Sequence, residues 1–259
     1  MDFPPPIQIP PQLQPYISRV WYAEGAAANA FPIFADGRTG LIFQQSGMIM
    51  SNSQKVLAHS FVFGQTLDPI ILQTNPNCRV LGLIFHPHVL PSIFPLHAKE
   101  LTDECVDISL LPAVPRVNLN ERLWNTVSPR RQFEILFSYL EKLISPVDPG
   151  MQYATNLILT AKGKTSLKEL HYHLNLTERT FERRFEQYVG ISPRLFSNIA
   201  QFQAAIGMLE SGEFSKLSDI AYANGYADQS HFIRWFKKFT GVTPLEHCRN
   251  HSILKTGSI

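Results

Sequence analysis

The sequence predicts an α+β chain with two parts. The first is a β-rich, barrel-like or sandwich-like domain with some helices, and the second is an all-α domain that contains two helix-turn-helix units. Short runs of β-branched, aromatic and aliphatic residues, separated by turn residues, occupy the first hundred positions. Amphipathic helical patterns follow them. One helical segment then occurs twice near the C-terminal end of the sequence.

The β-rich part is predicted from six short runs, which suggest a small barrel or sandwich. These runs are Arg19–Tyr22, Leu41–Gln44, Gly47–Met50, Phe61–Phe63, Ile70–Gln73 and Val80–Phe85. Turn signals lie between them at Asp36-Gly37, Asn52 and Asn75-Pro76-Asn77. Several aromatic side chains could line a pocket inside this domain, although core packing accounts for most of them: Trp21, Tyr22, Phe34, Phe43, Phe61, Phe63 and Phe85.

Helices are expected after about residue 100, and the clearest is Pro129–Ile144, with Ser128 as its cap. Its apolar stripe, which includes Phe137 and Leu140, could form a self-association surface or pack on the β-rich domain, and the pattern leaves both open. Residues 145–150 break the helical pattern and are the best linker. We therefore divide the chain into residues 1–147 and residues 148–259, with a packing helix over Met151–Ala161.

The repeated segment has an offset of 51 residues. The first copy is Phe181-Glu-Arg-Arg-Phe-Glu-Gln-Tyr-Val-Gly-Ile-Ser-Pro193, and the second is Phe232-Ile-Arg-Trp-Phe-Lys-Lys-Phe-Thr-Gly-Val-Thr-Pro244. Aromatic residues at i and i+4 place rings on one helix face, whereas the Arg at i+2 lies on the other. The shared Gly fits the position just past a helix end, and the Ser-Pro or Thr-Pro pair starts a new helix.

A short helix and a tight turn precede each copy. Leu167, Leu170 and Leu174 have helical spacing before the turn that leads to Thr177, a predicted N-cap. Leu217 and Ile220 have the same spacing before the second turn, in which Asp228 is the predicted cap. Two short helices joined by a tight turn form a helix-turn-helix. The helix between the copies, Pro193 to Glu210, would span roughly 27 Å, close to the ~34 Å between successive major-groove segments.

The segment from Leu217 to Pro244 closely resembles the second half of an AraC/XylS-type DNA-binding domain, and the resemblance extends over about residues 151–250. It implies a sequence-specific regulator of transcription that binds double-stranded DNA and is not an enzyme. In such chains the other domain is often a sensor or dimerisation domain. The resemblance therefore suggests a small-molecule effector, a homodimer and RNA polymerase as further partners. Operator, effector and direction of regulation stay open.

Candidate DNA-contacting residues follow from the outward helix faces and from matching family positions. For the first helix they are Arg179, Glu182 and Arg183. For the second they are Gln229, Ser230, His231 and Arg234, with Ile233 on the same face and Lys237 and Lys238 expected to contact phosphates. Arg suits guanine, Gln suits adenine and Glu suits the cytosine amino group. A merely solvated helix face is the alternative for any one residue.

Three departures from the family pattern concern mainly the first unit. His171 occupies a position where a small residue normally allows close helix crossing, and Gln201 stands where Arg is frequent. Glu182 and Glu186 place acid on a surface expected to approach DNA. One interpretation is that the first helix supplies selectivity and less general affinity.

Charge and composition agree with this division. Residues 1–150 hold 10 Lys/Arg and 12 Asp/Glu, whereas residues 151–259 hold 13 and 9, so the basic excess lies with the repeat. Three widely spaced cysteines, Cys78, Cys105 and Cys248, indicate a reducing compartment rather than a disulfide framework. No signal peptide and no apolar run of about 20 residues is found. We expect a cytoplasmic protein that does not enter a membrane.

The remaining chemical candidate is His86-Pro-His88 with His97, which could ligate a metal in a small β-barrel enzyme. Pro87 interrupts the strand alternation that would direct both rings inward, so we favour structural histidines and expect no metal, cofactor or catalytic residue. Two alternatives stay open. One is a metal-dependent, cupin-like enzyme with a DNA-binding tail, and the other is a DNA-binding protein that needs no ligand.

Overall fold

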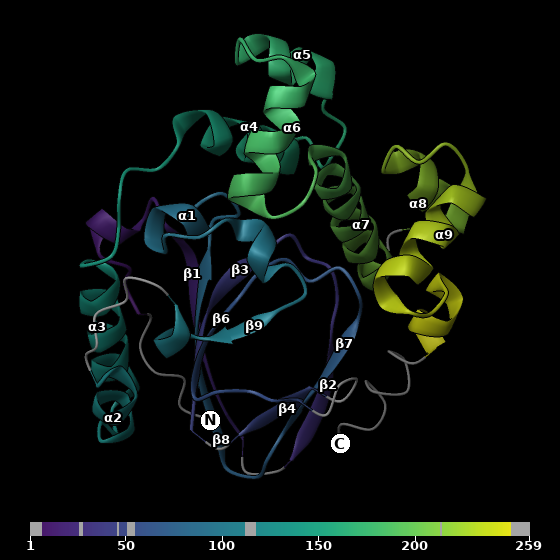
Figure 1. Cartoon of the computed structure of the whole chain (residues 1–259). Helices are drawn as coiled ribbons and strands as arrows, with labels where there is room; N and C mark the ends of the chain where they lie inside the picture. Colours follow the sequence, from purple (N-terminus) through teal and green to yellow (C-terminus); the bar gives the residue numbers. More distant parts are fainter. Residues whose placement is uncertain are drawn as a thin grey trace.

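The computed structural model of the chain (Figure 1) describes residues 7–25, 28–45, 47–50, 55–111, 118–212 and 214–249. Its first part contains two antiparallel sheets and a few short helices, and its second part is helical. The α+β class is confirmed. The predicted turn at Asn52 lies outside the described residues.

The larger sheet has five strands in the order β1-β8-β3-β6-β9, and the smaller has four in the order β2-β7-β4-β5. The strands of the first are β1 (Ile17–Gly25), β8 (Cys78–Phe85), β3 (Thr39–Gln44), β6 (Ser60–Phe63) and β9 (Cys105–Asp107). Those of the second are β2 (Asn29–Ile33), β7 (Ile70–Thr74), β4 (Met48–Met50) and β5 (Lys55–Val56).

All six predicted strands are present, and three further strands were missed. β2 contains Pro32, which cannot donate a ladder hydrogen bond, and it lies at the edge of its sheet as such a strand must. β9 is a three-residue edge strand that pairs with β6, and it interrupts the region after residue 100 that was expected to be helical. β5, of two residues, is too short to leave a pattern.

Alternation along the central strands builds two cores on opposite faces of the larger sheet. Leu41, Phe43 and Leu83 lie in the core that the helices cover. Ile42 and Val80 lie in the other core, together with residues of the smaller sheet. Most of the aromatic residues that we considered for a pocket therefore pack in these cores or against them, including Phe43, Phe61 and Phe85.

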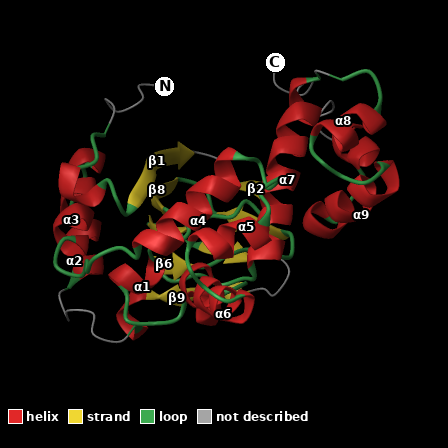
Figure 2. Ribbon diagram, turned by 90° about the horizontal axis from the view of Figure 1, so that it is seen from above, coloured by secondary structure: helices red, strands yellow, loops and turns green. Residues whose placement is uncertain are grey.

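The helices of the first part are α1 (Leu90–Ile93), η2 (Ala98–Leu101), α2 (Leu119–Trp124) and α3 (Pro129–Leu140), besides the short turns η1 (Pro11–Leu13) and η3 (Ile108–Leu110). α2 and α3 lie at the end of the molecule opposite the last two helices (Figure 2). α3 ends at Leu140, four residues earlier than expected. Phe137 and Leu140 are buried in the first core, so the stripe packs on the β-rich part and is not a free self-association surface.

The second part contains α4 (Pro149–Thr160), α5 (Leu167–His173), α6 (Glu178–Val189), α7 (Pro193–Ser211), α8 (Leu217–Ala223) and α9 (Gln229–Thr240). α4 begins two residues before the predicted start, because Asp148 caps it by accepting from the Met151 N–H at 3.0 Å. Residues 244–249 form a further helix. No helix among the described residues has the length and apolar content to cross a bilayer.

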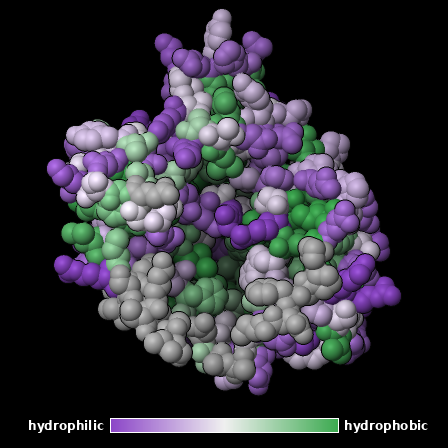
Figure 3. Space-filling model, turned by 180° about the vertical axis from the view of Figure 1, so that it is seen from behind, coloured by the Kyte–Doolittle hydropathy of each residue, from purple (hydrophilic) through white to green (hydrophobic). Residues whose placement is uncertain are grey.

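The helical core also takes in residues of the first part. Ala35 is fully buried in it, and Phe34 and Leu67 pack against it. Gln203 of α7 donates a hydrogen bond to the Ala35 carbonyl at 2.6 Å. The two parts therefore share a packed junction. Seen from behind, hydrophilic residues cover most of the tip of the helical part, and a narrow hydrophobic strip lies below it (Figure 3).

Candidate nucleic-acid interface

The first helix-turn-helix unit is α5 and α6 with the turn between them. Ser166 accepts a hydrogen bond from the Glu169 N–H, and Thr177 accepts one from the Thr180 N–H, so both helices carry side-chain N-caps. Asn175 adopts a left-handed φ of 53° in the turn, which Asn tolerates better than most residues. Gly190 ends α6 with a φ of 96°. The predicted caps and turn are thus present.

The second unit, α8 and α9, repeats this plan, but the turn between its helices is one residue longer. Gly225, rather than Asn, supplies the left-handed residue, with a φ of 77°. Asp228 caps α9 by accepting from the His231 N–H at 2.7 Å, and Gly241 ends the helix with a φ of 79°. Thr243 then caps the helix over residues 244–249 by accepting from the Glu246 N–H at 3.4 Å.

Aromatic side chains fix both recognition helices to α7. Phe185 of α6 packs against Phe196 of α7 with ring centroids 5.6 Å apart. Phe202 of α7 lies between Phe236 and Phe239 of α9, at 5.5 and 5.1 Å. Because these rings are almost fully buried, α7 holds the two units at a fixed separation. Its 19 residues span about 28 Å, and the units flank it in Figure 1.

Most of the predicted DNA-contacting residues lie on the solvent side of these helices. On α6, Arg179, Glu182 and Arg183 are exposed. On α9, the exposed residues are Gln229, Ser230, Arg234, Lys237 and Lys238. No ion pair among the described residues involves any of these side chains. Their charges are therefore available to a partner, although their roles in binding stay predictions.

Trp235, for which we predicted no role, contacts both His231 and Lys238 along α9. The indole N–H of Trp235 donates to Nε2 of His231 at 2.9 Å, and the imidazole ring also packs edge-on against Tyr226. The ammonium of Lys238 lies 4.8 Å from the Trp235 ring centroid, a cation–π distance. The backbone N–H of Ala227 also lies 3.5 Å from Nδ1 of His231. His231 is thus half-buried with a partner at each ring nitrogen, which leaves it less suited to reading a base. The i, i+4 spacing of His231 and Trp235 was the signal that could have predicted this pair.

Two residues differ from the outward positions that we expected. Ile233 is partly buried against the helical core. Glu186 binds Lys99 of η2, with 2.8 Å between Oε2 and Nζ, so it faces the β-rich part and not an approaching duplex. Of the two acidic residues Glu182 and Glu186, only Glu182 is exposed on α6.

His171, where a small residue was expected, changes the packing of the first unit. Its Nδ1 lies 3.0 Å from the Leu176 carbonyl oxygen, so the ring spans the turn. A cavity of about 370 Å³ lies beside it, lined also by Lys168, Phe181 and Glu182. Ala221 at the equivalent position of the second unit is fully buried. The side chains at these two equivalent positions therefore differ in burial.

The first unit is also bound to the residues that precede α4 and to η2. The guanidinium of Arg184 pairs with the Asp148 carboxylate, whose side chain is 4% exposed. Burial raises the pKa of this carboxyl, but the hydrogen bonds from the Met151 N–H and from Arg184 outweigh that effect and hold it below its usual value. The Thr102 hydroxyl donates to the Gly190 carbonyl at 2.9 Å.

Of the histidines considered for a metal, His88 lies at the junction of the two parts. His88 is 1% exposed, and its Nδ1 lies 2.9 Å from the Thr155 hydroxyl of α4. Burial lowers the pKa of His88 to about 4. Nε2 of His86 lies 3.3 Å from the Gln14 carbonyl oxygen, and the backbone N–H of His97 donates to the Glu100 carboxylate. Among the described residues, no three His, Cys, Asp or Glu side chains come together as metal ligands.

The cysteines are separate from one another. Cys78 and Cys105 carry free thiols. Burial raises the pKa of Cys105 to about 11, which keeps it a weakly nucleophilic thiol. Packing therefore accounts for it better than redox chemistry does.

Comparisons with known proteins cover the two parts separately. Residues 171–250 match the family described as "Helix-turn-helix domain", and residues 6–107 match "Domain of unknown function (DUF6597)". A regulator of Bacillus subtilis, "Uncharacterized HTH-type transcriptional regulator YisR", is 29% identical over 86 residues, which are 33% of this chain and 30% of that protein. A Haemophilus influenzae protein with the same kind of name is 28% identical over 87 residues, 34% and 29% of the two chains. The chain thus matches about a third of the length of these relatives.

Two solved structures are also similar to this chain, each with a TM-score below 0.5. ToxT from Vibrio cholerae is 15% identical with a TM-score of 0.49, over 89% of this chain and 97% of that one. The C-terminal domain of AraT, a response regulator from Geobacillus stearothermophilus, is 27% identical with a TM-score of 0.38, over 41% and 88%.

Proposed function

We propose that this chain, whose C-terminal part is a helix-turn-helix domain of the AraC type, is a regulator of transcription that reads two neighbouring segments of duplex DNA. One observation carries the proposal. Two capped recognition helices, at the two ends of a single linker helix, present exposed basic and polar residues at equivalent positions.

Each recognition helix has a distinct role in this proposal. Arg179, Glu182 and Arg183 of α6 would contact base edges, as would Gln229, Ser230 and Arg234 of α9. Lys237 and Lys238 would contact phosphates, because neighbouring lysines at the end of α9 form a basic edge without fixed hydrogen-bond geometry. His231 would contribute least to DNA contacts, since the Trp235 indole N–H already donates to its Nε2.

The β-rich part, residues 1–147 in our division, would control this DNA-binding part. The shared core around Ala35 and the contact between Glu186 and Lys99 give it a physical route to α7 and α6. Cytoplasmic location, pairing with a second copy and contact with RNA polymerase belong to the same proposal. It assigns the chain no catalytic residue and no metal.

The test is a selection of duplexes from a random library by the full-length protein. Because α6 and α9 would enter successive turns of one groove, we expect enriched sites with two conserved segments about 10–10.5 base pairs apart, centre to centre. Sites with one conserved segment would show that a single unit reads DNA. A library that stays random after selection would contradict the proposal.

A substitution in α6 then tests selectivity. Glu182→Gln removes the carboxylate acceptor suited to cytosine while keeping the size of the side chain. We expect the preference at one base pair of one segment to relax, with a loss of about 1–3 kcal/mol at the original site. Glu178→Gln, at another exposed position of α6 outside the proposed contacts, is the control that removes the same charge. Unchanged selection with Glu182→Gln would remove Glu182 from the contacts.

A further inference from the structure

The turn that leads into the first helix-turn-helix unit contacts the second unit directly. This turn joins α4 to α5 and comprises residues 161–166. The ammonium of Lys164 donates a hydrogen bond to the Ala223 carbonyl, at the end of α8, over 2.6 Å. A side chain that precedes the first unit thus reaches a residue of the second unit 59 positions further along the chain.

Two glycines allow the turns of both units to come close to this contact. A Cβ at Gly163 would clash with the Ser197 carbonyl of α7, so a side chain does not fit there. In the turn of the second unit, a Cβ at Gly225 would lie 3.4 Å from Cγ of Lys164 and 3.5 Å from Nε2 of Gln201. The backbone next to Lys164 is therefore held against α7, and the second turn lies close to the stem of this side chain.

The carbonyl that Lys164 binds lacks a partner inside its own helix. It lies in the last turn of α8, where carbonyls have no intrahelical donor. The three carbonyls before it, at Ile220, Ala221 and Tyr222, accept from backbone N–H groups of the following turn. A cation at a helix C-terminus is also favoured by the helix dipole. Lys164 therefore completes the C-terminal cap of α8 from another part of the chain.

We infer that Lys164 is a positioning residue, which sets the orientation of the second unit relative to the first. Phe202 of α7 holds α9 through its ring contacts, whereas Lys164 holds α8. The second unit is thus attached through both of its helices. Attachment through both helices resists a rotation about α7 that attachment through α9 alone would allow.

The consequence for DNA recognition rests on the proposed function. If α6 and α9 enter successive turns of one groove, their mutual orientation decides which spacing of the two DNA segments the chain accepts. Lys164 lies on neither recognition helix. Its loss should therefore relax the spacing requirement and leave the preference within each segment unchanged.

The first experiment measures the orientation of the units in the full-length protein without DNA. Spin labels are attached to p-acetylphenylalanine in place of Tyr172 and Tyr222, which are exposed at equivalent positions of α5 and α8. Pulsed EPR then gives the distribution of distances between the labels. Lys164→Met removes the ammonium and keeps most of the stem, so we expect a broader distribution than in the wild type. Lys164→Arg keeps a cationic donor and should keep the wild-type width.

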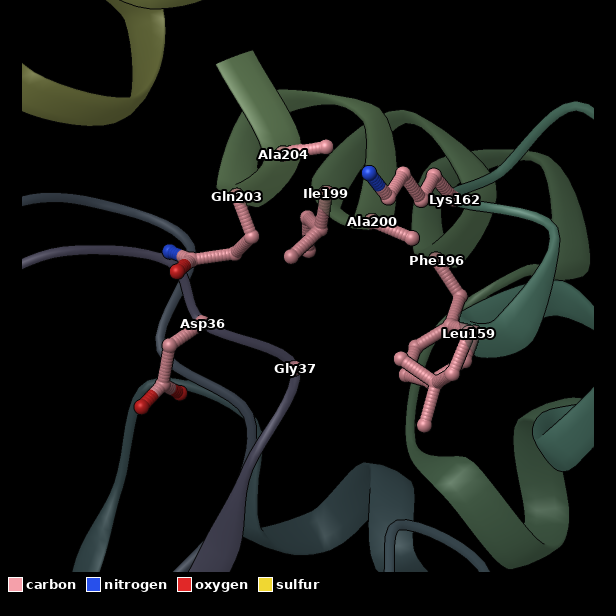
Figure 4. A pocket seen from close by; sticks show the side chains of 9 residues that line it. All are labelled: Asp36, Gly37, Leu159, Lys162, Phe196, Ile199, Ala200, Gln203 and Ala204. Atoms are coloured by element: carbon pink, nitrogen blue, oxygen red, sulfur yellow. The ribbon is translucent and has the colours of Figure 1, made fainter. Parts of the chain in front are cut away.

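Lys162→Met is the matched control, because it removes the same charge from the same turn. Lys162 lines a cavity of about 200 Å³ between α4, α7 and the turn after β2 (Figure 4). No ion pair among the described residues includes it. An unchanged distribution in Lys164→Met would overturn the inference, as would equal broadening in Lys164→Arg or Lys162→Met. Thermal unfolding checks each variant, and an unfolded Lys164→Met would also overturn it, because a positioning residue is not required for folding.

The second experiment uses duplexes that carry the two selected segments at the selected spacing, or with one base pair inserted or removed between them. We expect Lys164→Met to lower the ratio of dissociation constants between the wrong and the selected spacing roughly two- to fivefold, the range for exposed charged contacts. Affinity for a duplex with one segment should not change. An unchanged ratio, or an equal loss on every duplex, would overturn the consequence for spacing. A broader distance distribution in a protein that binds no DNA would leave the positioning role standing and refute the proposed function.

Discussion

The two helix-turn-helix units have the same plan but differ in charge and in attachment. α6 carries three Arg and three Glu, whereas α9 carries one Arg, two Lys and no acidic residue. α6 is bound to the β-rich part and its border by ion pairs, Glu186 with Lys99 and Arg184 with Asp148. The second unit meets that part through Phe34 and His247, whose rings lie 5.9 Å apart.

This difference indicates that the two copies of one repeated sequence can contribute differently to DNA binding. Four of the charged residues of α6 stay exposed, Glu178, Arg179, Glu182 and Arg183, and their charges cancel. The exposed charges of α9 are all positive, so we expect it to supply the general attraction to phosphates. The first unit would then contribute mainly selectivity, from a position that the β-rich part fixes.

The largest effect is expected at His88, which joins the β-rich part to α4 beneath the first unit. Folding keeps this imidazole neutral, with a pKa of about 4, whereas the unfolded chain takes up the proton near the ordinary value of 6.5. The free energy of unfolding is therefore highest above pH 6.5. It falls by up to about 3 kcal/mol as the pH is lowered towards 4. Burial also lowers the pKa of His86, which adds to the same trend.

His88→Asn keeps a hydrogen-bonding group near Thr155 and removes the titration. Chemical unfolding at pH 7 and pH 4.5 should therefore show a smaller loss of stability for this variant than for the wild type. His173→Asn, at an exposed position of α5, is the control substitution. An unchanged pH profile in His88→Asn would mean that His88 does not anchor the junction.

The next effect concerns the buried ion pair of the first unit. Arg184→Gln leaves the almost inaccessible Asp148 carboxylate with its cap hydrogen bond but without a cation. We expect unfolding free energy to fall by about 2 kcal/mol, as for hydrogen bonds to charged groups. The neighbouring Arg183 is exposed and unpaired, so Arg183→Gln should cost less than about 0.5 kcal/mol. Equal losses of unfolding free energy in the two variants would show that the ion pair of Arg184 with Asp148 does not stabilise the fold.

The smallest effect is expected for Lys99 and Glu186, an exposed pair that joins η2 to α6. A double-mutant cycle of Lys99→Gln and Glu186→Gln should give a coupling energy of about 0.2–1 kcal/mol. High salt should reduce it, because the lysine side chain is well exposed. Zero coupling at low salt would mean that the Thr102 hydrogen bond and apolar packing alone hold the two surfaces together.

Much of this architecture could be predicted, because its signals are local. The caps at Thr177 and Asp228, the helix-ending Gly190 and Gly241, and the buried Phe positions follow from spacing within a few residues. The strands β2 and β9 could not, since an edge position allows Pro32 and a very short strand.

The tertiary contacts of the site could not be predicted as well as its caps and helix ends. Nothing in the local pattern distinguishes Glu186, which binds Lys99, from Glu182, which stays exposed, because the partner is 87 residues away. The same holds for the stripe with Phe137 and Leu140, whose pattern fits either a free surface or a buried one until the sheet beneath it is known.

The central claim is that α9 reads base edges through Arg234 while its lysines contact phosphates. Arg234→Ala and Lys237→Ala are the matched pair, because Lys238 also packs on Trp235. Each variant is titrated with the selected duplex and with a random duplex at two salt concentrations. Arg234→Ala should lose about 1–3 kcal/mol on the selected site and little on random DNA. Lys237→Ala should weaken both duplexes alike and lower the salt slope by about one unit. If neither variant changes binding, α9 is not a recognition helix, and the account is contradicted at its centre.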